Sequence, residues 1–284
     1  VNRSGKECIT LGQDNKPVIN EELCIGCGIC PKRCPAGCIS IINLPSELEQ
    51  PIHRYGKNGF SLYNLPIPIF GKVVGILGRN GIGKSTALKI LAGQIMPNFG
   101  GEKEASYDEL IDLFKGSEAQ LFFEKVNKGE IKISFKPQQV DLIAKTQKGK
   151  VRDLLKRVDE KNKLDEIAKE LEIDKILDNN IENVSGGELQ RIAIAACVLR
   201  DANLYIFDEP SSYLDIKQRI KVSKFIRGLA NESTAVVVVE HDAQTILSAD
   251  WVIDIGPGAG KNGGKIVFQG TPEELKKANT LTAK

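Results

Sequence analysis

The chain has 284 residues, of which 41% are hydrophobic and 27% are charged, and its formal net charge is +2. This composition is typical of a globular protein, and so small a net charge argues neither for nor against a nucleic-acid partner. No apolar run approaches the roughly 20 residues that a membrane-spanning helix needs, and the polar first residues are unlike a secretory signal. We therefore expect a cytoplasmic protein with no membrane partner.

Six of the seven cysteines fall between residues 8 and 38, which favours a metal site over disulfides in a cytoplasmic protein. Four of them follow the spacing C-x-x-C-x-x-C-x-x-x-C-P, at Cys24, Cys27, Cys30 and Cys34. In bacterial ferredoxins this run holds [4Fe–4S] clusters, because thiolates suit soft iron–sulfur centres. A structural zinc site is the alternative.

Residues 1–45 are therefore predicted to form a small ferredoxin-like α+β iron–sulfur segment, with short strands on both sides of the cysteine run. A two-cluster ferredoxin has a second such run, and this sequence has only one. The cluster of the first three cysteines then needs a fourth ligand. Cys8 and Cys38 are candidates, and each is equally plausible as a small buried residue. We expect at most one complete cluster, in a segment that corresponds to half of such a ferredoxin.

Residues 46–284 form the second predicted domain, which opens on a proline-rich stretch of short strands and turns. Tyr55 and Phe60 lie in this stretch, at about the distance before the next motif at which aromatic rings stack on an adenine. A small aromatic core is the alternative interpretation of these two rings.

Residues 71–93 carry the clearest motif of the chain. A buried strand is predicted at Val73–Leu77, followed by G-x-x-x-x-G-K-S and an apolar-periodic helix, the context that a phosphate-binding loop requires. Glycines let the N–H groups of such a loop face a phosphate, and the helix N-terminus adds positive charge. Lys84 is expected to reach the β- and γ-phosphates, and Ser85 to bind Mg²⁺. The predicted loop residues are Gly78, Asn80, Gly81, Gly83, Lys84, Ser85 and Thr86.

Two helical stretches come next in the chain. Residues 106–131 are predicted to be amphipathic and helical, and residues 150–178 to be helices with mixed charge, most of it on a solvated face. Between them, Gln138 follows a short strand, and its amide could contact Mg²⁺ and an attacking water.

The segment SGGELQ, residues 185–190, places a serine and two glycines at the start of an alanine-rich helix. We expect that helix to run from Arg191 to Leu199. A helix start of this kind predicts a second anion site, formed by Ser185 and Gly187.

Two further apolar strands are predicted to end in polar residues. The first ends in Asp208 and Glu209, of which Asp208 is expected to hold Mg²⁺ through water and Glu209 to polarise the attacking water. The second, Ala235–Val239, is followed closely by His241, which is expected to sense the γ-phosphate. A lone histidine is more often structural, but the place of this one after the earlier motifs favours a functional role.

The order of these motifs resembles that of the ATP-binding-cassette (ABC) ATPases from about residue 50 to residue 245. The resemblance implies an α/β fold of the P-loop type, with ATP and Mg²⁺ as ligands. In that family two cassettes meet head to tail, and each ATP lies between the loop of one and the SGGELQ-type signature of the other. Because this sequence has one loop and one signature, we expect the second cassette to come from another copy or another chain.

Within that family, the cysteine run together with the segments SGGELQRIAIAA and FDEPSSYLDIKQR resembles the ribosome-recycling ATPases, also called RNase L inhibitor proteins. This resemblance implies that Tyr55 and Phe60 flank the adenine. It also implies that nucleotide-driven closure splits ribosomes into subunits, with the small ribosomal subunit as the partner.

The last part of the sequence, from ADWVIDIGPGAG onward, is similar instead to the excision-repair ATPase UvrA. Two other functions therefore remain open at this point: a DNA-repair-associated ATPase, and a truncated module that binds ATP without productive turnover.

Overall fold

The computed structural model describes residues 7, 9–11, 17–19, 50–56, 59–241, 243–257 and 264–278. The six N-terminal cysteines lie outside these residues, including the predicted cluster ligands Cys24, Cys27, Cys30 and Cys34. Two short strands of this part are described, β1 (Ile9–Leu11) and β2 (Pro17–Ile19), and they pair antiparallel. The second of them lies in the stretch before the cysteine run, where the sequence predicts a strand.

The main sheet has six strands in the order β10-β9-β5-β8-β7-β6. Its strands are β5 (Val73–Leu77), β6 (Ile133–Lys136), β7 (Leu204–Asp208), β8 (Ala235–Val239), β9 (Trp251–Gly256) and β10 (Lys265–Gly270). All neighbouring strands are parallel except β10, which pairs antiparallel with β9. Both faces of a parallel sheet are covered, which is why β5, β7 and β8 are continuous apolar runs. A separate two-stranded sheet joins β3 (His53–Arg54) and β4 (Ser61–Leu62).

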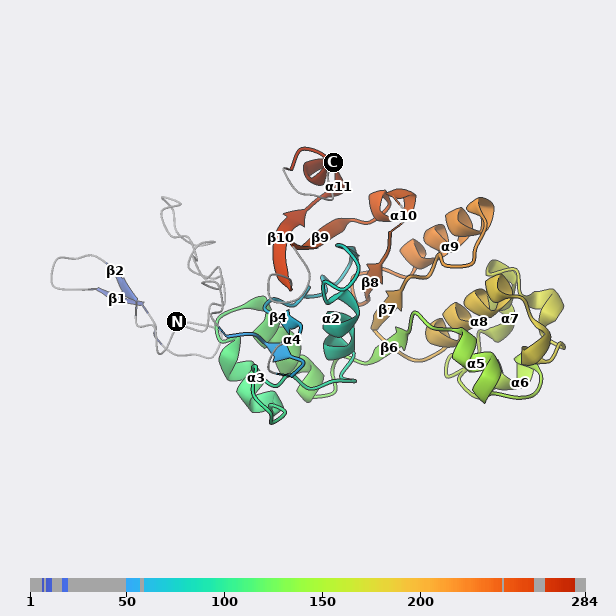
Figure 1. Cartoon of the computed structure of the whole chain (residues 1–284), viewed down its shortest axis with the longest axis horizontal. Helices are drawn as coiled ribbons and strands as arrows, with labels where there is room; N and C mark the ends of the chain where they lie inside the picture. Colours follow the sequence, from blue (N-terminus) through green and yellow to red (C-terminus); the bar gives the residue numbers. More distant parts are fainter. Residues whose placement is uncertain are drawn as a thin grey trace.

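Helices cover both faces of the main sheet (Figure 1). On one side lie α2 (Lys84–Leu91), α3 (Tyr107–Leu113) and α4 (Glu118–Asn127). On the other side lie α5 (Asp141–Thr146), α6 (Val151–Lys156), α7 (Leu164–Glu170), α8 (Gly186–Val198) and α9 (Ile216–Gly228). Two 3-10 turns, at Asp174–Ile176 and Ile181–Asn183, precede α8. The helices α10 (Ala243–Leu247) and α11 (Pro272–Leu275) follow later strands.

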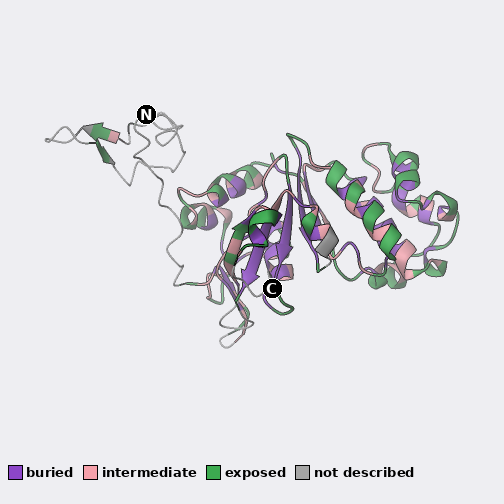
Figure 2. Cartoon of the chain, turned by 90° about the horizontal axis from the view of Figure 1, so that it is seen from above, coloured by how far each residue is buried: buried purple, intermediate pink, exposed green. Residues whose placement is uncertain are grey.

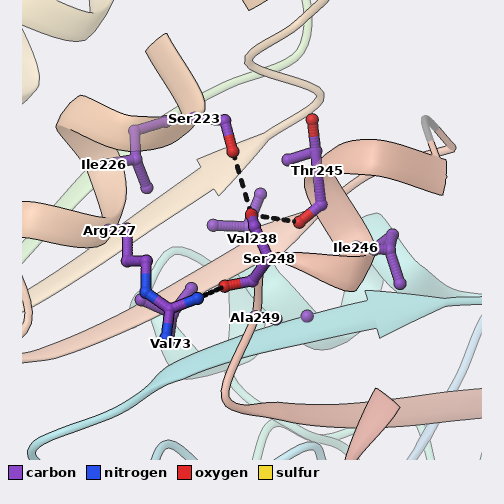
Figure 3. A pocket seen from close by; sticks show the side chains of 10 residues that line it. Val73, Ser223, Ile226, Arg227, Val238, Thr245, Ile246, Ser248 and Ala249 are labelled. Carbon is purple, nitrogen blue, oxygen red and sulfur yellow. Dashed lines mark hydrogen bonds between the residues drawn. The ribbon is translucent and has the colours of Figure 1, made fainter. Parts of the chain in front are cut away.

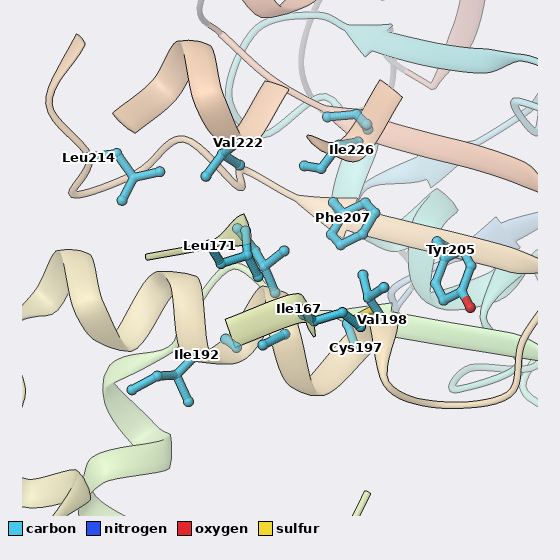
Figure 4. Packing of buried hydrophobic residues seen from close by; sticks show 14 of the residues in the cluster. Ile167, Leu171, Ile192, Cys197, Val198, Tyr205, Phe207, Leu214, Val222 and Ile226 are labelled. Atoms are coloured by element: carbon cyan, nitrogen blue, oxygen red, sulfur yellow. The ribbon is translucent and has the colours of Figure 1, made fainter. Parts of the chain in front are cut away.

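The hydrophobic core is split in two by the sheet, because alternate residues of a strand face opposite sides. In β7, Tyr205 and Phe207 pack against the side of α7, α8 and α9 (Figure 4), whereas Leu204 and Ile206 pack on the side of α2 and α4. Figure 2 shows the result: the central strands of the sheet, among them β5, β7 and β8, are buried, while the helices keep exposed outer faces. Each large apolar side chain buried in this way contributes about 1.5–3 kcal/mol.

The helical prediction for residues 106–131 is confirmed, and the stretch forms two helices: the first ends at Leu113, and Ser117 precedes the second. One helix prediction needs correction. The helix expected to start at Arg191 starts at Gly186, because Ser185 and Glu188 form a reciprocal capping box that offsets the poor helix propensity of the two glycines. The strands predicted at Val73–Leu77 and Ala235–Val239 are confirmed with the same bounds. In the described part of the chain, no helix has the length and apolar character needed to cross a bilayer.

Candidate functional site

The loop between β5 and α2 has the shape that the phosphate-binding prediction requires. Gly78, Gly81 and Gly83 all have positive φ angles, of 140°, 77° and 102°. A Cβ atom on Gly78 would lie 2.5 Å from the Ile255 carbonyl oxygen, so only glycine fits there. The loop opens α2, whose first turn has no acidic residue. The backbone N–H groups of the loop and of the first turn of α2 can therefore face an anion, as in other phosphate sites at helix N-termini.

Lys84 lies under this loop and is nearly buried, at 6% exposure. Its Nζ donates hydrogen bonds to the carbonyl oxygens of Gly78, at 2.6 Å, and Arg79, at 3.0 Å. Burial lowers the pKa of Lys84, and the nearby carboxylates of Glu209 and Asp208 partly offset that effect. A desolvated ammonium group in this position is a strong partner for phosphate oxygens.

Asp208 and Ser85 come together as the Mg²⁺ prediction requires. The Ser85 side chain lies close enough to the Asp208 carboxylate to affect its pKa, and Asp208 is only 3% exposed. The Asp208 Oδ1 oxygen is buried and has no hydrogen-bond partner. Burial raises the pKa of Asp208, against the opposing effect of Ser85. An unsatisfied carboxylate oxygen beside a hydroxyl fits a hard cation such as Mg²⁺.

The cation would need phosphate oxygens to complete its coordination. Among the described residues, no three His, Cys, Asp or Glu side chains are grouped closely enough to hold a metal on their own. Mg²⁺ ordinarily binds through one or two carboxylates plus substrate phosphates, so this donor set fits an ion that arrives with a nucleotide.

Glu209 and His241 meet at the carboxyl ends of the adjacent strands β7 and β8. His241 Nε2 lies 3.5 Å from Glu209 Oε1. The other carboxylate oxygen of Glu209 accepts a hydrogen bond from Ser212 Oγ at 3.3 Å. The Glu209 side chain keeps 21% of its surface exposed and the His241 side chain 45%, so solvent and substrate reach both.

Three other residues were predicted to contact the phosphates, Mg²⁺ or the attacking water. Gln138 is exposed and follows β6, the neighbour of β7 in the sheet. Asn80 is exposed in the loop, and Thr86 is half-buried in the first turn of α2.

The two aromatic residues lie on the hairpin of β3 and β4. The Phe60 ring is packed against the loop, since a Cβ atom on Gly83 would lie 2.1 Å from Phe60 Cζ. Tyr55 is 45% exposed, and its backbone N–H donates to the Phe60 carbonyl oxygen at 3.0 Å. Its ring meets the His53 ring edge to face, with centroids 4.7 Å apart. The Phe60 ring thus borders the phosphate loop, and the exposed Tyr55 ring can contact a ligand.

The signature residues Ser185 and Gly187 are not brought to the phosphate loop. The helix that they open, α8, belongs to the core on one face of the sheet, and α2 belongs to the core on the other. The Ser185 hydroxyl donates to Glu188 Oε2 at 2.8 Å and accepts from the Glu188 N–H at 3.3 Å. Gly187 packs against the backbone of Tyr213, whose carbonyl oxygen would lie 3.0 Å from an added Cβ.

Sequence reasoning missed a layer of buried polar residues under the site. Glu240 is 2% exposed and accepts hydrogen bonds from the Ser211 N–H at 2.7 Å, from Ser211 Oγ at 2.8 Å and from the His241 N–H at 3.2 Å. It therefore ties the segment after Glu209 to the loop of His241. The available signal was a charged residue directly after a fully apolar strand, a place where a carboxylate needs partners.

A small enclosed space among the described residues is not a ligand site. It lies between β5, α9 and α10, where Ser223 and Ser248 share a hydrogen bond of 2.9 Å (Figure 3). Its volume is about 10 Å³. A cavity of that size holds about one water molecule and is too small for a nucleotide.

Comparison with known proteins agrees with this geometry. A family model described as "ABC transporter" matches residues 69–212, just over half of the chain. A second model, "4Fe-4S binding domain", matches residues 17–40 and confirms the iron–sulfur prediction for that segment. The resident cofactor of the N-terminal segment is thus a [4Fe–4S] cluster, and ATP with Mg²⁺ belongs to the cassette.

The similar proteins include an uncharacterized ATP-binding protein and a ribosome recycling factor. The uncharacterized ABC transporter ATP-binding protein MJ0719 of Methanocaldococcus jannaschii is 53% identical over 244 residues, 84% of this chain and 40% of that protein. An archaeal ribosome recycling factor, solved in complex with the stalk protein aP1, is 49% identical with a TM-score of 0.74, over 79% of this chain and 43% of that one. A structure described as ribosome-bound archaeal Pelota and ABCE1 matches at 50% identity and a TM-score of 0.74. The match covers 96% of this chain and 46% of the chain in that structure.

This chain spans about 40% of the length of the curated relatives that it matches. The similarity to UvrA is partial and falls in the C-terminal part, which contributes β9 and β10 to the sheet. UvrABC system protein A of Aquifex aeolicus is 47% identical over 102 residues, 35% of this chain and 11% of that protein. With a phosphate loop, a carboxylate pair and a matching family model over more than half of its length, the chain belongs to the ABC family of ATPases, and the relatives that it resembles within that family are the RNase L inhibitor proteins.

Proposed function

We propose that residues 46–284 form an ATP-hydrolysing cassette and that residues 1–45 form an iron–sulfur domain attached to it. One observation carries the ATPase proposal: Lys84, Asp208 and the Glu209–His241 pair lie at the carboxyl ends of the adjacent strands β5, β7 and β8. Open parallel sheets bind their ligands at this edge.

In the proposed reaction the loop and Lys84 hold the β- and γ-phosphates. Ser85 and Asp208 hold Mg²⁺, which when bound neutralises charge that develops on the transferred phosphoryl group. Glu209 takes a proton from the attacking water, and Gln138 orients that water. His241 contacts the γ-phosphate. The products are ADP and phosphate.

Nucleotide recognition in this proposal uses two further sets of residues. Tyr55 and Phe60 hold the adenine, which agrees with the exposure of Tyr55 and the packing of Phe60 on the loop. Ser185 and Gly187 contact the ATP of a second cassette, supplied by another copy or another chain. Their position on the face of the sheet opposite α2 supports this head-to-tail arrangement.

We further propose that this ATPase works in the cytoplasm on ribosomes and helps to split them into subunits, with the small subunit as partner. The support is the combination of a 4Fe-4S model and an ABC model in one chain, together with 49% identity to an archaeal ribosome recycling factor. A non-transporter role also agrees with the identity of 47% to the translation initiation factor RLI1 of Saccharomyces cerevisiae, whereas a bacterial ABC exporter with a similar fold is only 20% identical.

The test is co-sedimentation with purified ribosomal subunits in the presence of a non-hydrolysable ATP analogue. We expect the chain to pellet with the small subunit when the analogue is present and to remain in the supernatant without it. A Lys84→Ala variant is the control for nucleotide dependence. Binding to a damaged DNA duplex, with none to ribosomal subunits, would contradict the ribosome proposal and favour the repair function that the UvrA-like part suggests.

A further inference from the structure

The backbone at Glu209 has an unusual conformation. Its φ angle is 47°, in the left-handed region that a residue with a long side chain rarely adopts. A conformation of this kind persists only where the surrounding structure holds it. The Glu209 N–H donates to the Val239 carbonyl oxygen at 2.9 Å, which holds the start of the turn. The groups that hold the carbonyl end of the same turn determine the direction of the Glu209 carboxylate.

Two buried side chains hold that other end. Gln190 Nε2 donates to the Glu209 carbonyl oxygen at 2.8 Å. Lys136 Nζ donates to the Asp208 carbonyl oxygen at 2.9 Å and to that of Glu209 at 3.3 Å. Gln190 is 0% exposed and Lys136 is 1% exposed, so neither bond competes with bulk water. The donors come from two different elements, α8 and β6.

Packing alone does not account for a lysine at this place. Burying an ammonium group costs free energy, and a buried ion pair can often be replaced by apolar side chains of the same size without loss of stability. Burial lowers the pKa of Lys136 to about 8, while the carboxylates of Asp208, Glu240 and Glu209 oppose that change. The long side chain ends at two consecutive carbonyl groups of the strand that carries the site.

We propose that Lys136 and Gln190 are positioning residues for ATP hydrolysis, which hold the left-handed turn at Glu209 and so aim its carboxylate at the attacking water. They act through the backbone of the turn, because Lys136 donates to the carbonyl oxygens of Asp208 and Glu209 and Gln190 donates to that of Glu209. This inference rests on the proposed ATPase activity. It links the signature helix α8 to the water-activating residue of the same cassette.

The test compares the variants Lys136→Met and Gln190→Met of the full chain. Each substitution keeps the approximate length of the side chain and removes the donor. Because a displacement of about 1 Å in an active site can cost on the order of 100-fold in rate, we expect turnover to fall by about 10- to 100-fold. The affinity for a fluorescent ATP analogue should stay at the wild-type value, since the phosphate loop is untouched.

Matched controls come from residues of the same types that lie away from the Glu209 turn. Lys132 is four positions before Lys136 and pairs with Asp201 on the surface, and Gln120 is half-buried on α4. Lys132→Met and Gln120→Met should keep wild-type turnover. The effects of the two test variants should be less than additive in the double variant, because both donors act on one carbonyl group.

Several outcomes would overturn the inference. One is wild-type turnover in both Lys136→Met and Gln190→Met. Another is loss of nucleotide affinity in parallel with turnover, which indicates a general structural defect. Lys136→Met leaves nearby carboxylates without a counter-charge. If that variant does not fold, the turnover of the neutral variant Gln190→Met decides whether the proposal holds.

If the unmodified chain hydrolyses no ATP, the proposed function fails, and the inference is decided by a crystal structure of Gln190→Met. A Glu209 turn that moves out of the left-handed region supports the positioning role. A turn that keeps its positive φ and its distance to His241 contradicts it.

Discussion

His241 Nε2 lies 3.5 Å from Glu209 Oε1, although 32 positions separate the two residues in the chain. The contact exists because β7 and β8 are parallel neighbours, so the residues that follow both strands leave the sheet at the same edge. Lys84 reaches this edge from β5, the other neighbour of β8. We propose that the γ-phosphate lies at this edge, among the carboxylate, the imidazole and the ammonium.

The first prediction concerns Lys84. Lys84→Ala should reduce ATP turnover by about 100-fold or more, because it removes the charge that faces the β- and γ-phosphates. The Nζ bonds to the carbonyl oxygens of Gly78 and Arg79 are also lost. Steady-state phosphate release and equilibrium binding of ATP measure the effect. Unchanged rate together with unchanged affinity would show that this loop is not the nucleotide site.

The second prediction concerns the cysteine run. Anaerobically reconstituted protein should contain iron and sulfide, and Cys27→Ser should lose both. ATP binding should survive in that variant, because the described cassette has its own two-sided core. The test is an analysis of metal and sulfide in both purified proteins, together with a measurement of their affinity for ATP. Zinc without sulfide in the unmodified protein would contradict the cluster assignment.

The third prediction is a loss of stability in mild acid through His53. The side chain is 6% exposed, neither ring nitrogen has a hydrogen-bond partner, and burial lowers its pKa against a weaker opposing effect of Glu104. The unfolded chain therefore binds a proton before the folded chain does, and the free energy of unfolding falls as the pH drops below about 6.5.

His53→Phe keeps the ring and removes the titrating group. Its melting temperature should change less than that of the unmodified chain between about pH 7.5 and about pH 5.5, the range in which histidine titrates. The other histidine of the chain, His241, is exposed and stays in both proteins as an internal reference. Equal melting-temperature changes in the two proteins would assign the acid sensitivity to other groups.

The fourth prediction concerns assembly. If the signature of one cassette completes the site of another, turnover per chain should rise with protein concentration, and Ser185→Arg should abolish that rise while ATP binding persists. The substitution also removes a helix cap, which costs about 0.5–2 kcal/mol. Ser106→Arg removes an equivalent capping box from α3 and is the matched control for that cost. Turnover that is independent of concentration in the unmodified chain contradicts the two-cassette arrangement.

Much of this site could be predicted from sequence because its signals are local. The loop from Gly78 to Ser85 is contiguous, and β5 and β8 are unbroken apolar runs that end next to polar residues. Such patterns need no knowledge of which strands are neighbours. The helix of the SGGELQ segment was predicted from Arg191, and the capping box of Ser185 and Glu188 starts it at Gly186.

The supporting residues could not be found in this way. Lys136 matters because β6 lies beside β7, and Gln190 because α8 packs under the end of that strand. All the hydrogen bonds that these two side chains donate to the turn go to backbone carbonyl groups, which have no sequence signature of their own. The strand order of the sheet is set by the packing of two cores, so only the assembled fold reveals these contacts.

The most direct test of the ATPase assignment is a single-turnover measurement with radiolabelled ATP on Glu209→Gln and the unmodified chain. Glutamine keeps the size of the side chain but cannot take a proton from water, and general bases contribute about 100- to 10,000-fold to rate. The account predicts that the variant binds Mg-ATP with unchanged or higher affinity and that its bound nucleotide is recovered as ATP. Conversion of bound ATP to ADP by the variant at the rate of the unmodified chain would contradict it.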